Sequence, residues 1–325
     1  MTSTTYENAA APESDLRRRG IRLGDVVFKG IAILAALAAT VLLGWIAFKV
    51  FDLAWPAIQD FGLSFIWTDA WNPVTKDFGA LIFIYGTVVT SLIALVLATP
   101  LSIAIALFLT EIAPRRLAAP IATMVELLAA IPSVVLGLWG ILVFGPWVNN
   151  HLEPWIQDTP LGVLPMFSGS TSAAGSIFLA ALVLTIMIIP ITSAICRELF
   201  IRVPKDLTDG ALALGSTRWE SIRGVMFAYA APGIAAAVLL GLGRAFGEAI
   251  AVNQTIGNHN AIPSSWFEPG DSLGSKVASE YVGATSLEQA SSILYLAAIL
   301  MVISLATNVV AQFIVVRFEK ARRAV

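Results

Sequence analysis

The sequence predicts an all-α membrane protein with six transmembrane helices, and three observations support this fold class. Apolar residues make up 57% of the 325 residues and charged residues only 13%, about half the charged share of a soluble domain. The mean hydropathy is correspondingly high, at +0.81. Uncharged runs long enough to cross a hydrocarbon core of about 30 Å, which takes roughly 20 helical residues, recur along the whole chain.

We place the six expected spans on these runs. They are Val26–Phe51, Leu81–Thr110, Leu117–Phe144, Ser176–Leu199, Val225–Ile256 and Ser291–Val316. Residues 1–25 form a polar N-terminal tail, whose first 16 residues we expect to be disordered, and residues 318–325 form a C-terminal tail.

The first span is expected to stay in the mature protein. Gly30–Phe48 contains 19 uncharged residues, whereas a signal peptide has a core of about 7 to 15 apolar residues followed by a small-residue cleavage site. No such site is evident here. We therefore interpret residues 26–51 as a membrane anchor.

The second span lies in an uncharged run of 33 residues, Phe78–Thr110. This run is too long for one upright helix and predicts tilt or an additional interfacial turn. Prolines fall within or near four spans, where neighbouring helices can satisfy the carbonyl groups that proline frees. They are Pro100, Pro132, Pro190 and Pro232.

Basic residues indicate the orientation, because Lys and Arg accumulate in cytoplasmic loops. The N-terminal segment, the second and fourth loops and the C-terminal end hold 16 of the 20 basic residues. The first, third and fifth loops hold only Lys76 and Lys276, with Lys49 at the outer end of the first span. Both termini are therefore expected in the cytoplasm.

The outward loops are rich in tryptophan. These residues are typical of an aromatic belt at the lipid headgroups, and as a set they would also suit a docking face for a partner outside the membrane. The sequence does not separate the two interpretations. The residues are Trp55, Trp67, Trp71, Trp147 and Trp155.

The longest inward loop, residues 203–234, predicts two short helices. Leu207, Ala211 and Leu214 recur at helical spacing after Pro204, and Gly215 is expected to end this first helix. A second helix is expected around Trp219. A helix–turn–helix that projects from a bundle suits a groove in another protein, although periodicity alone fits equally well with a helix that lies on its own bundle.

This loop contains the run DGALALGSTRW, which resembles the EAA signature of ABC-importer permeases. Asp209, Gly210 and Ala211 stand at the Glu-Ala-Ala triplet, and Gly215 stands at the following glycine. Asp209 replaces glutamate and Gly210 replaces alanine, which weakens a helix by about 1 kcal/mol. The resemblance implies that residues 203–224 dock on a nucleotide-binding subunit, through a surface that includes Leu214 and Trp219, and transmit its closure.

A closer resemblance extends from about residue 20 to residue 318. Three stretches are similar to the PstC family, one of two permease subunits of the bacterial high-affinity phosphate importer. They are FGLSFIWTDAWNPVTKDFGALIFIYGTVVTS, ALFLTEIAPRRLAAPIATMVELLAAIPSVVLGLWGILVFGP and GLGRAFGEAIAVNQTIGN.

The resemblance implies a type I ABC importer fold in the inner membrane, with a permease domain over residues 78–317. It also implies a PstA-like sister permease, a PstB-like ATPase dimer and a PstS-like phosphate-binding protein as partners. The sequence lacks GxxxxGK[ST], so ATP and Mg²⁺ are expected on the separate ATPase and no cofactor on this chain.

Three charged residues lie well inside the expected spans, away from their ends: Glu126, Arg244 and Glu248. An ionised side chain at the bilayer centre costs about 2.5 to 3.5 kcal/mol on insertion scales, so each is expected to face protein or water. Arg244 and Glu248 are four residues apart, and an intrahelical ion pair would lower the cost. The glycines beside Arg244, Gly243 and Gly247, have the spacing that lets helices approach closely.

The alternative is that Arg244 lines a pathway and offers its guanidinium group to phosphate oxygens, held by Glu248 when the ion is absent. The resemblance favours this role, since the family's arginine and glutamate are implicated in translocation. Glu126 is expected to be a counter-ion for a basic residue on this chain or its sister, with a place in the pathway left open.

Other classes fit less well. A GxSxG match at Ser272 is expected to be a turn rather than a nucleophile elbow, because both histidines precede it. Cys196 is expected in packing, with no metal site, and the net charge of −2 gives no reason to expect nucleic acid. A permease for sulfate or molybdate, or an ion-coupled secondary transporter, remains an alternative.

Overall fold

The structure is a computed structural model that describes residues 23–169 and 175–323. The first 22 residues of the expected N-terminal tail lie outside this part. The chain divides into two units, residues 1–49 and 50–325. The described part of the first unit is entirely helical and belongs to α1 (Leu23–Phe61).

Six helical stretches of the described chain are long and apolar enough to cross a membrane, which confirms the expected number of spans. They are Val26–Ile66, Leu81–Ile112, Ser133–Gln157, Ile177–Ile201, Arg218–Gly247 and Leu287–Ile314.

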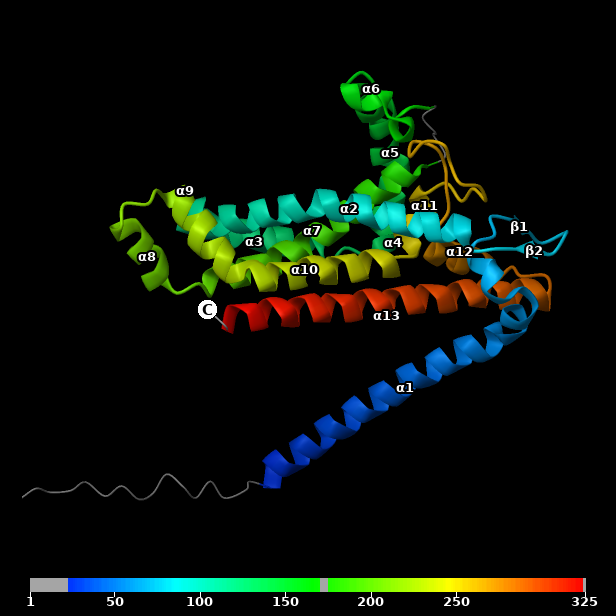
Figure 1. The fold of residues 1–325 in the computed structure, drawn as a ribbon, viewed down its shortest axis with the longest axis horizontal. Helices are drawn as coiled ribbons and strands as arrows, with labels where there is room; N and C mark the ends of the chain where they lie inside the picture. The colour runs from blue at the N-terminus through cyan, green and yellow to red at the C-terminus, as the bar shows by residue number, and fades with distance from the viewer. Residues whose placement is uncertain (1–22, 170–174, 324–325) are drawn as a thin grey trace, which may run out of the picture. The chain divides into compact units, whose positions relative to one another are not determined.

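The second unit is built around four long helices that run alongside one another in Figure 1: α2 (Leu81–Leu107), α7 (Ile177–Ile201), α10 (Phe227–Gly247) and α13 (Leu287–Arg323). The helix α7 is uncharged up to Cys196 and is the most buried of the six spans, as expected of a helix in the centre of a bundle. Small residues of α2, Ala94 and Ala98, let α7 pack closely against it.

One end of the second unit carries the inward loop of the sequence analysis, and we call it the α8 end (Figure 1). Here α8 (Lys205–Ala213) and α9 (Arg218–Ser221) are followed by a π-helical turn, η7 (Ile222–Met226), that leads into α10. Buried apolar residues, including Cys196 of α7 and Met226 of η7, fix η7 and the start of α10 to α7.

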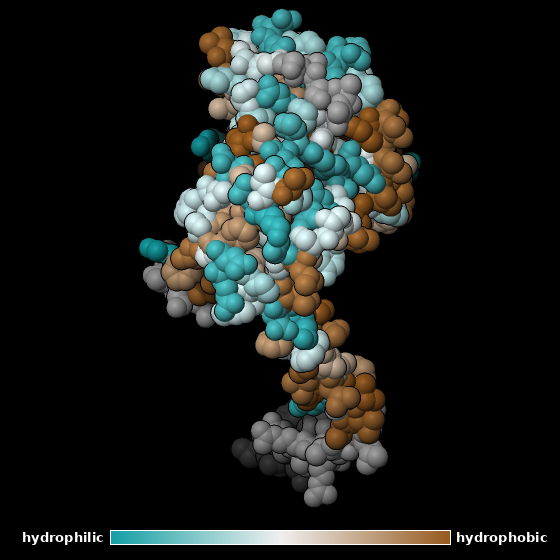
Figure 2. All heavy atoms as spheres, turned by 90° about the vertical axis from the view of Figure 1, so that its right-hand side faces the viewer, coloured by the Kyte–Doolittle hydropathy of each residue, from teal (hydrophilic) through white to brown (hydrophobic). Residues whose placement is uncertain are grey.

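The opposite end carries a two-stranded antiparallel hairpin, and we call it the hairpin end. The strands β1 (Trp71–Asn72) and β2 (Asp77–Phe78) follow a 3-10 turn, η1 (Gly62–Ile66), and lie near α12 (Leu273–Glu280) in Figure 1. Hydrophilic side chains gather on this face, while hydrophobic side chains gather along its flank (Figure 2). This distribution fits an end that emerges from the bilayer.

The third span differs from the expected one. The expected helix Leu117–Phe144 is broken, because α3 (Arg115–Leu128) ends before Pro132, whose backbone is extended. The membrane-length helix begins only at Ser133. It comprises α4 (Ser133–Trp139), η3 (Gly140–Phe144), α5 (Gly145–Trp147), η4 (Val148–Leu152) and α6 (Glu153–Gln157), of which η3 and η4 are π-helical.

The break has a local cause. Proline disfavours a helical conformation in the residue before it and cannot donate a backbone hydrogen bond.

Two 3-10 turns, η5 (Pro160–Val163) and η6 (Pro165–Phe167), follow the third span. In the second span, a π-helical turn, η2 (Phe108–Ile112), follows α2 and accounts for the extra length of that run.

The fifth span is also interrupted. The expected helix Val225–Ile256 ends at Gly247, and a separate short helix, α11 (Ile250–Thr255), follows. Glu248 lies between them with an extended backbone, φ −79° and ψ 116°. The sixth span is longer than expected, since α13 continues to Arg323 and includes most of the expected C-terminal tail.

Candidate functional site

Arg244 lies in the last turn of α10 with an exposed side chain. Among the described residues, none forms a hydrogen bond or ion pair with it. A guanidinium group in a span is not tolerated against lipid, and it therefore needs protein or water as its neighbour. The N–H donors of Arg244 are therefore available to a group that is not among the described residues.

Glu248 does not pair with Arg244 in the part of the chain that the structure describes. Its Oε1 instead accepts a hydrogen bond from the backbone N–H of Ala251, at 3.2 Å, at the start of α11. The predicted intrahelical pair needs a continuous helix between the two residues. Because α10 ends at Gly247, Glu248 caps the next helix instead.

Glu126 does have a partner. Its Oε1 lies 3.3 Å from Nη1 of Arg197 on α7, so that a basic residue of this chain is its partner. Glu126 is 54% exposed and lies in α3 rather than inside the third span. This pair could not be predicted from the sequence, since its members are 71 residues apart. Among the described residues, Glu126 contacts neither Arg244 nor Glu248 through a hydrogen bond or ion pair.

The two helices of the inward loop form as expected. Gly215, at φ +90°, ends α8 in the left-handed region that favours glycine, and a capping box of Thr217 and Glu220 begins α9. Asp209 and Gly210 are exposed and Ala211 is half-buried.

An apolar surface is exposed on these helices. Leu214 is 92% exposed and Trp219 is 62% exposed. Large apolar side chains in this position are typical of a contact with another protein.

A buried ion cluster at the hairpin end escaped the sequence analysis. Lys276, 2% exposed, donates hydrogen bonds to Asn260 and Glu280 and lies 3.6 Å from Asp271. Trp71 is also buried, and its Nε1 donates to Glu280 at 3.0 Å. Trp71 therefore belongs to this cluster and not to an exposed aromatic belt.

Burial raises the pKa of Asp271, while the positive charge of Lys276 acts in the opposite direction. Ser272, next to it, accepts a hydrogen bond from the backbone N–H of Ser275 and caps α12. The GxSxG match is therefore the start of a helix, with Ser272 in an extended conformation, and not the expected turn.

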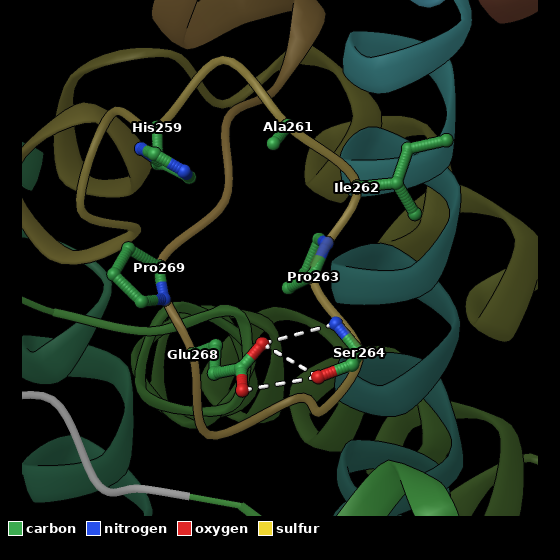
Figure 3. A pocket seen from close by; sticks show the side chains of 7 residues that line it. All are labelled: His259, Ala261, Ile262, Pro263, Ser264, Glu268 and Pro269. Carbon is green, nitrogen blue, oxygen red and sulfur yellow. Dashed lines mark hydrogen bonds between the residues drawn. The ribbon is translucent and has the colours of Figure 1, made fainter.

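A pocket of about 390 Å³ lies in the loop between α11 and α12 (Figure 3). Ser264 donates to both carboxylate oxygens of Glu268 on one side, and His259 lies across the loop. The lining contains neither lysine nor arginine. A carboxylate without a basic neighbour repels anions, so this pocket does not suit an anion.

Comparisons with known proteins identify the family. The model of the binding-protein-dependent transport system inner membrane component family matches residues 98–324. The phosphate transport system permease protein PstC of Pasteurella multocida is 38% identical over 312 residues, covering 95% of this chain and 97% of that protein.

The PstC protein of Mesorhizobium japonicum is 39% identical over 315 residues, covering 96% of each chain. A solved bacterial alginate ABC transporter has a chain with a TM-score of 0.55 and 20% identity, covering 93% of this chain and 98% of its own. That likeness concerns the fold alone. The chain belongs to the binding-protein-dependent inner membrane transport components and, among them, to the PstC family of phosphate transport permeases.

Proposed function

We propose that this chain is a permease subunit of an ATP-driven phosphate importer and forms half of the pathway for inorganic phosphate. The observation that carries the proposal is the similarity to phosphate permeases at 38% and 39% identity over nearly the whole chain. The unpaired arginine in α10 supports it, because an anion supplies what that arginine lacks.

Arg244 is the residue we assign to the anion. Its planar group can donate two parallel hydrogen bonds to phosphate oxygens. Glu248 holds the start of α11 beside it and limits how far the helix break can move. Glu126 and Arg197 form an ion pair near the α8 end, which we assign to holding α3 against α7 rather than to contact with phosphate.

The α8 end is the proposed contact with the ATPase. A PstB-like dimer that binds ATP and Mg²⁺ would dock on the exposed surface around Asp209, Leu214 and Trp219, and Gly215 lets the chain turn between the two helices. We place this end in the cytoplasm, with both termini. A PstA-like permease would complete the pathway and a PstS-like protein would deliver phosphate.

The test is uptake of labelled phosphate by cells that carry Arg244→Ala as their only copy of this chain. We expect uptake to fall by about one to two orders of magnitude, since a hydrogen bond to a charged group contributes about 1.5 to 3 kcal/mol. Arg244→Lys should retain partial uptake, because it keeps the charge and loses the fork.

Normal uptake by Arg244→Ala, with the complex assembled, would contradict the role of Arg244. Uptake of sulfate or molybdate in place of phosphate by the wild-type complex would redirect the proposal to another oxyanion.

A further inference from the structure

A groove between α10 and α13 holds two polar side chains that the proposed function does not use. Its volume of about 480 Å³ is within the range of about 300 to 1,000 Å³ that is typical of small-molecule sites. The lining residues are Ala236, Leu239 and Leu240 of α10 and Asn308, Ala311, Gln312 and Val316 of α13.

The groove lies next to Arg244. Leu240, in the lining, is one helical turn before Arg244 and therefore shares its face of α10. A Cβ atom placed on Gly243 would stand 3.4 Å from Oδ1 of Asn308. Asn308 is thus at the level of the arginine, and Gln312, one turn further along α13, is nearer the α8 end.

Asn308 and Gln312 are exposed, and neither has a hydrogen bond to another described residue. Their neighbour Thr307 differs, since its hydroxyl donates to the carbonyl of Ile303 in its own helix at 2.8 Å. Lipid offers amides no hydrogen bonds, so two unpaired carboxamides in a span need protein or water beside them.

We propose that Asn308 and Gln312 bind the transported phosphate on its way from Arg244 toward the α8 end. This inference rests on the proposed function. The amide N–H groups donate to phosphate oxygens without adding charge, and each such bond is weaker than that of a guanidinium group. Weak, successive contacts let an anion leave the arginine rather than remain trapped on it.

A rival occupant of the groove is a helix of the sister permease. The position of Asn308 beside the unpaired arginine favours the anion. Arg244, Asn308 and Gln312 all have N–H groups without an acceptor among the described residues, and an anion provides acceptors for all three. Gly243 also keeps the groove open at this level, since a larger side chain there would enter the space in front of Asn308.

The experiment compares wild-type and variant complexes, purified with their partners and reconstituted in vesicles, by uptake of labelled phosphate. Asn308→Leu and Gln312→Leu keep the size of the side chains and remove their donors, and Asn308→Asp adds a like charge. We expect uptake to fall about tenfold or more in each. Subunit co-purification and ATPase activity without phosphate should not change.

Thr307→Val is the matched control, because it removes a polar group that is already satisfied within its helix. Its uptake should equal that of the wild type. Wild-type uptake by Asn308→Leu and Gln312→Leu would overturn the inference and leave the proposed function intact. Loss of co-purification in these variants would assign the groove to the sister permease instead, and a wild-type complex that does not move phosphate would overturn both.

Discussion

At the scale of single residues, the side chains that matter are those whose polar groups lack a partner within the chain. Arg244 is exposed in a span, and no described residue pairs with its guanidinium group. Glu153 of α6 is the contrasting case, because it is 0% exposed and the hydroxyl of Ser176 is the one side-chain donor beside its carboxyl among the described residues. A buried carboxyl with so few donors costs several kcal/mol when it is ionised.

Because its carboxyl is buried, Glu153 should contribute little to the stability of the fold. We expect Glu153→Gln, which keeps the shape and removes the charge, to leave the free energy of unfolding unchanged or to raise it by about 1 to 2 kcal/mol. The measurement is thermal unfolding of the purified complex in detergent at neutral pH. Destabilisation by more than about 2 kcal/mol, as in a typical damaging core substitution, would mean that the carboxylate has an essential partner.

At the scale of elements, the helix ends decide how the chain is organised. Pro132 separates α3 from the third span, Glu248 separates α10 from α11, and Gly215 separates α8 from α9. In the last case the left-handed backbone of the glycine makes the turn possible. Two glycines of α8 and its turn can be compared directly, because neither has a neighbour within 4 Å of an added Cβ.

Gly210 lies in the helical interior of α8 and Gly215 lies at φ +90°. Gly210→Ala should stabilise α8 by about 1 kcal/mol, and Gly215→Ala should destabilise the turn by about the same amount. Hydrogen exchange of the α8 amides measures both, with slower exchange expected in the first variant and faster exchange in the second. A similar change in both would show that packing and not backbone conformation controls this loop.

The buried cluster at the hairpin end ties α12 to the hairpin through Lys276. Lys276→Met leaves the buried Asp271 and the half-buried Glu280 without their cation, which should cost about 3 to 5 kcal/mol of stability. The matched control is Lys76→Met, since the ion pair of Lys76 with Glu288 is exposed and should contribute less than about 1 kcal/mol. Thermal unfolding of the two variants measures the difference.

The stability of the Lys276→Met variant should depend on pH in a defined direction. Burial raises the pKa of Asp271, and removal of Lys276 raises that pKa further. A carboxyl whose pKa is higher in the folded state destabilises the fold as pH rises through the interval above its ordinary value. Lys276→Met should therefore be further below the wild type in unfolding temperature at pH 8 than at pH 5, and equal deficits at both would contradict this.

At the scale of the whole molecule, the second unit exposes a different kind of surface at each of three levels. The α8 end exposes apolar side chains, the middle exposes Arg244 with Asn308 and Gln312, and the hairpin end is hydrophilic (Figure 2). No described residue of this chain covers the apolar side chains of the α8 end or pairs with Arg244, Asn308 or Gln312. We therefore expect the subunit reconstituted alone to be inactive in phosphate uptake, and activity to appear only when the sister permease and the ATPase are added with ATP.

The sequence by itself determined the six spans, the helix–turn–helix of the inward loop and the family. Hydrophobic run length, glycine position and motif spacing are local properties, so a single segment carries each of them. The position of Arg244 inside a span was also accessible, because the apolar run around it is visible along the chain, whereas its separation from Glu248 was not.

Only the tertiary structure decided which groups meet. The pair of Glu126 and Arg197, the cluster around Lys276 and the groove of Asn308 beside Gly243 each join segments far apart in the sequence. The helix break at Glu248 likewise separated a pair that spacing alone predicted. Ion pairs and grooves depend on how helices pack against one another. Hydropathy along the sequence does not specify which helices will be in contact.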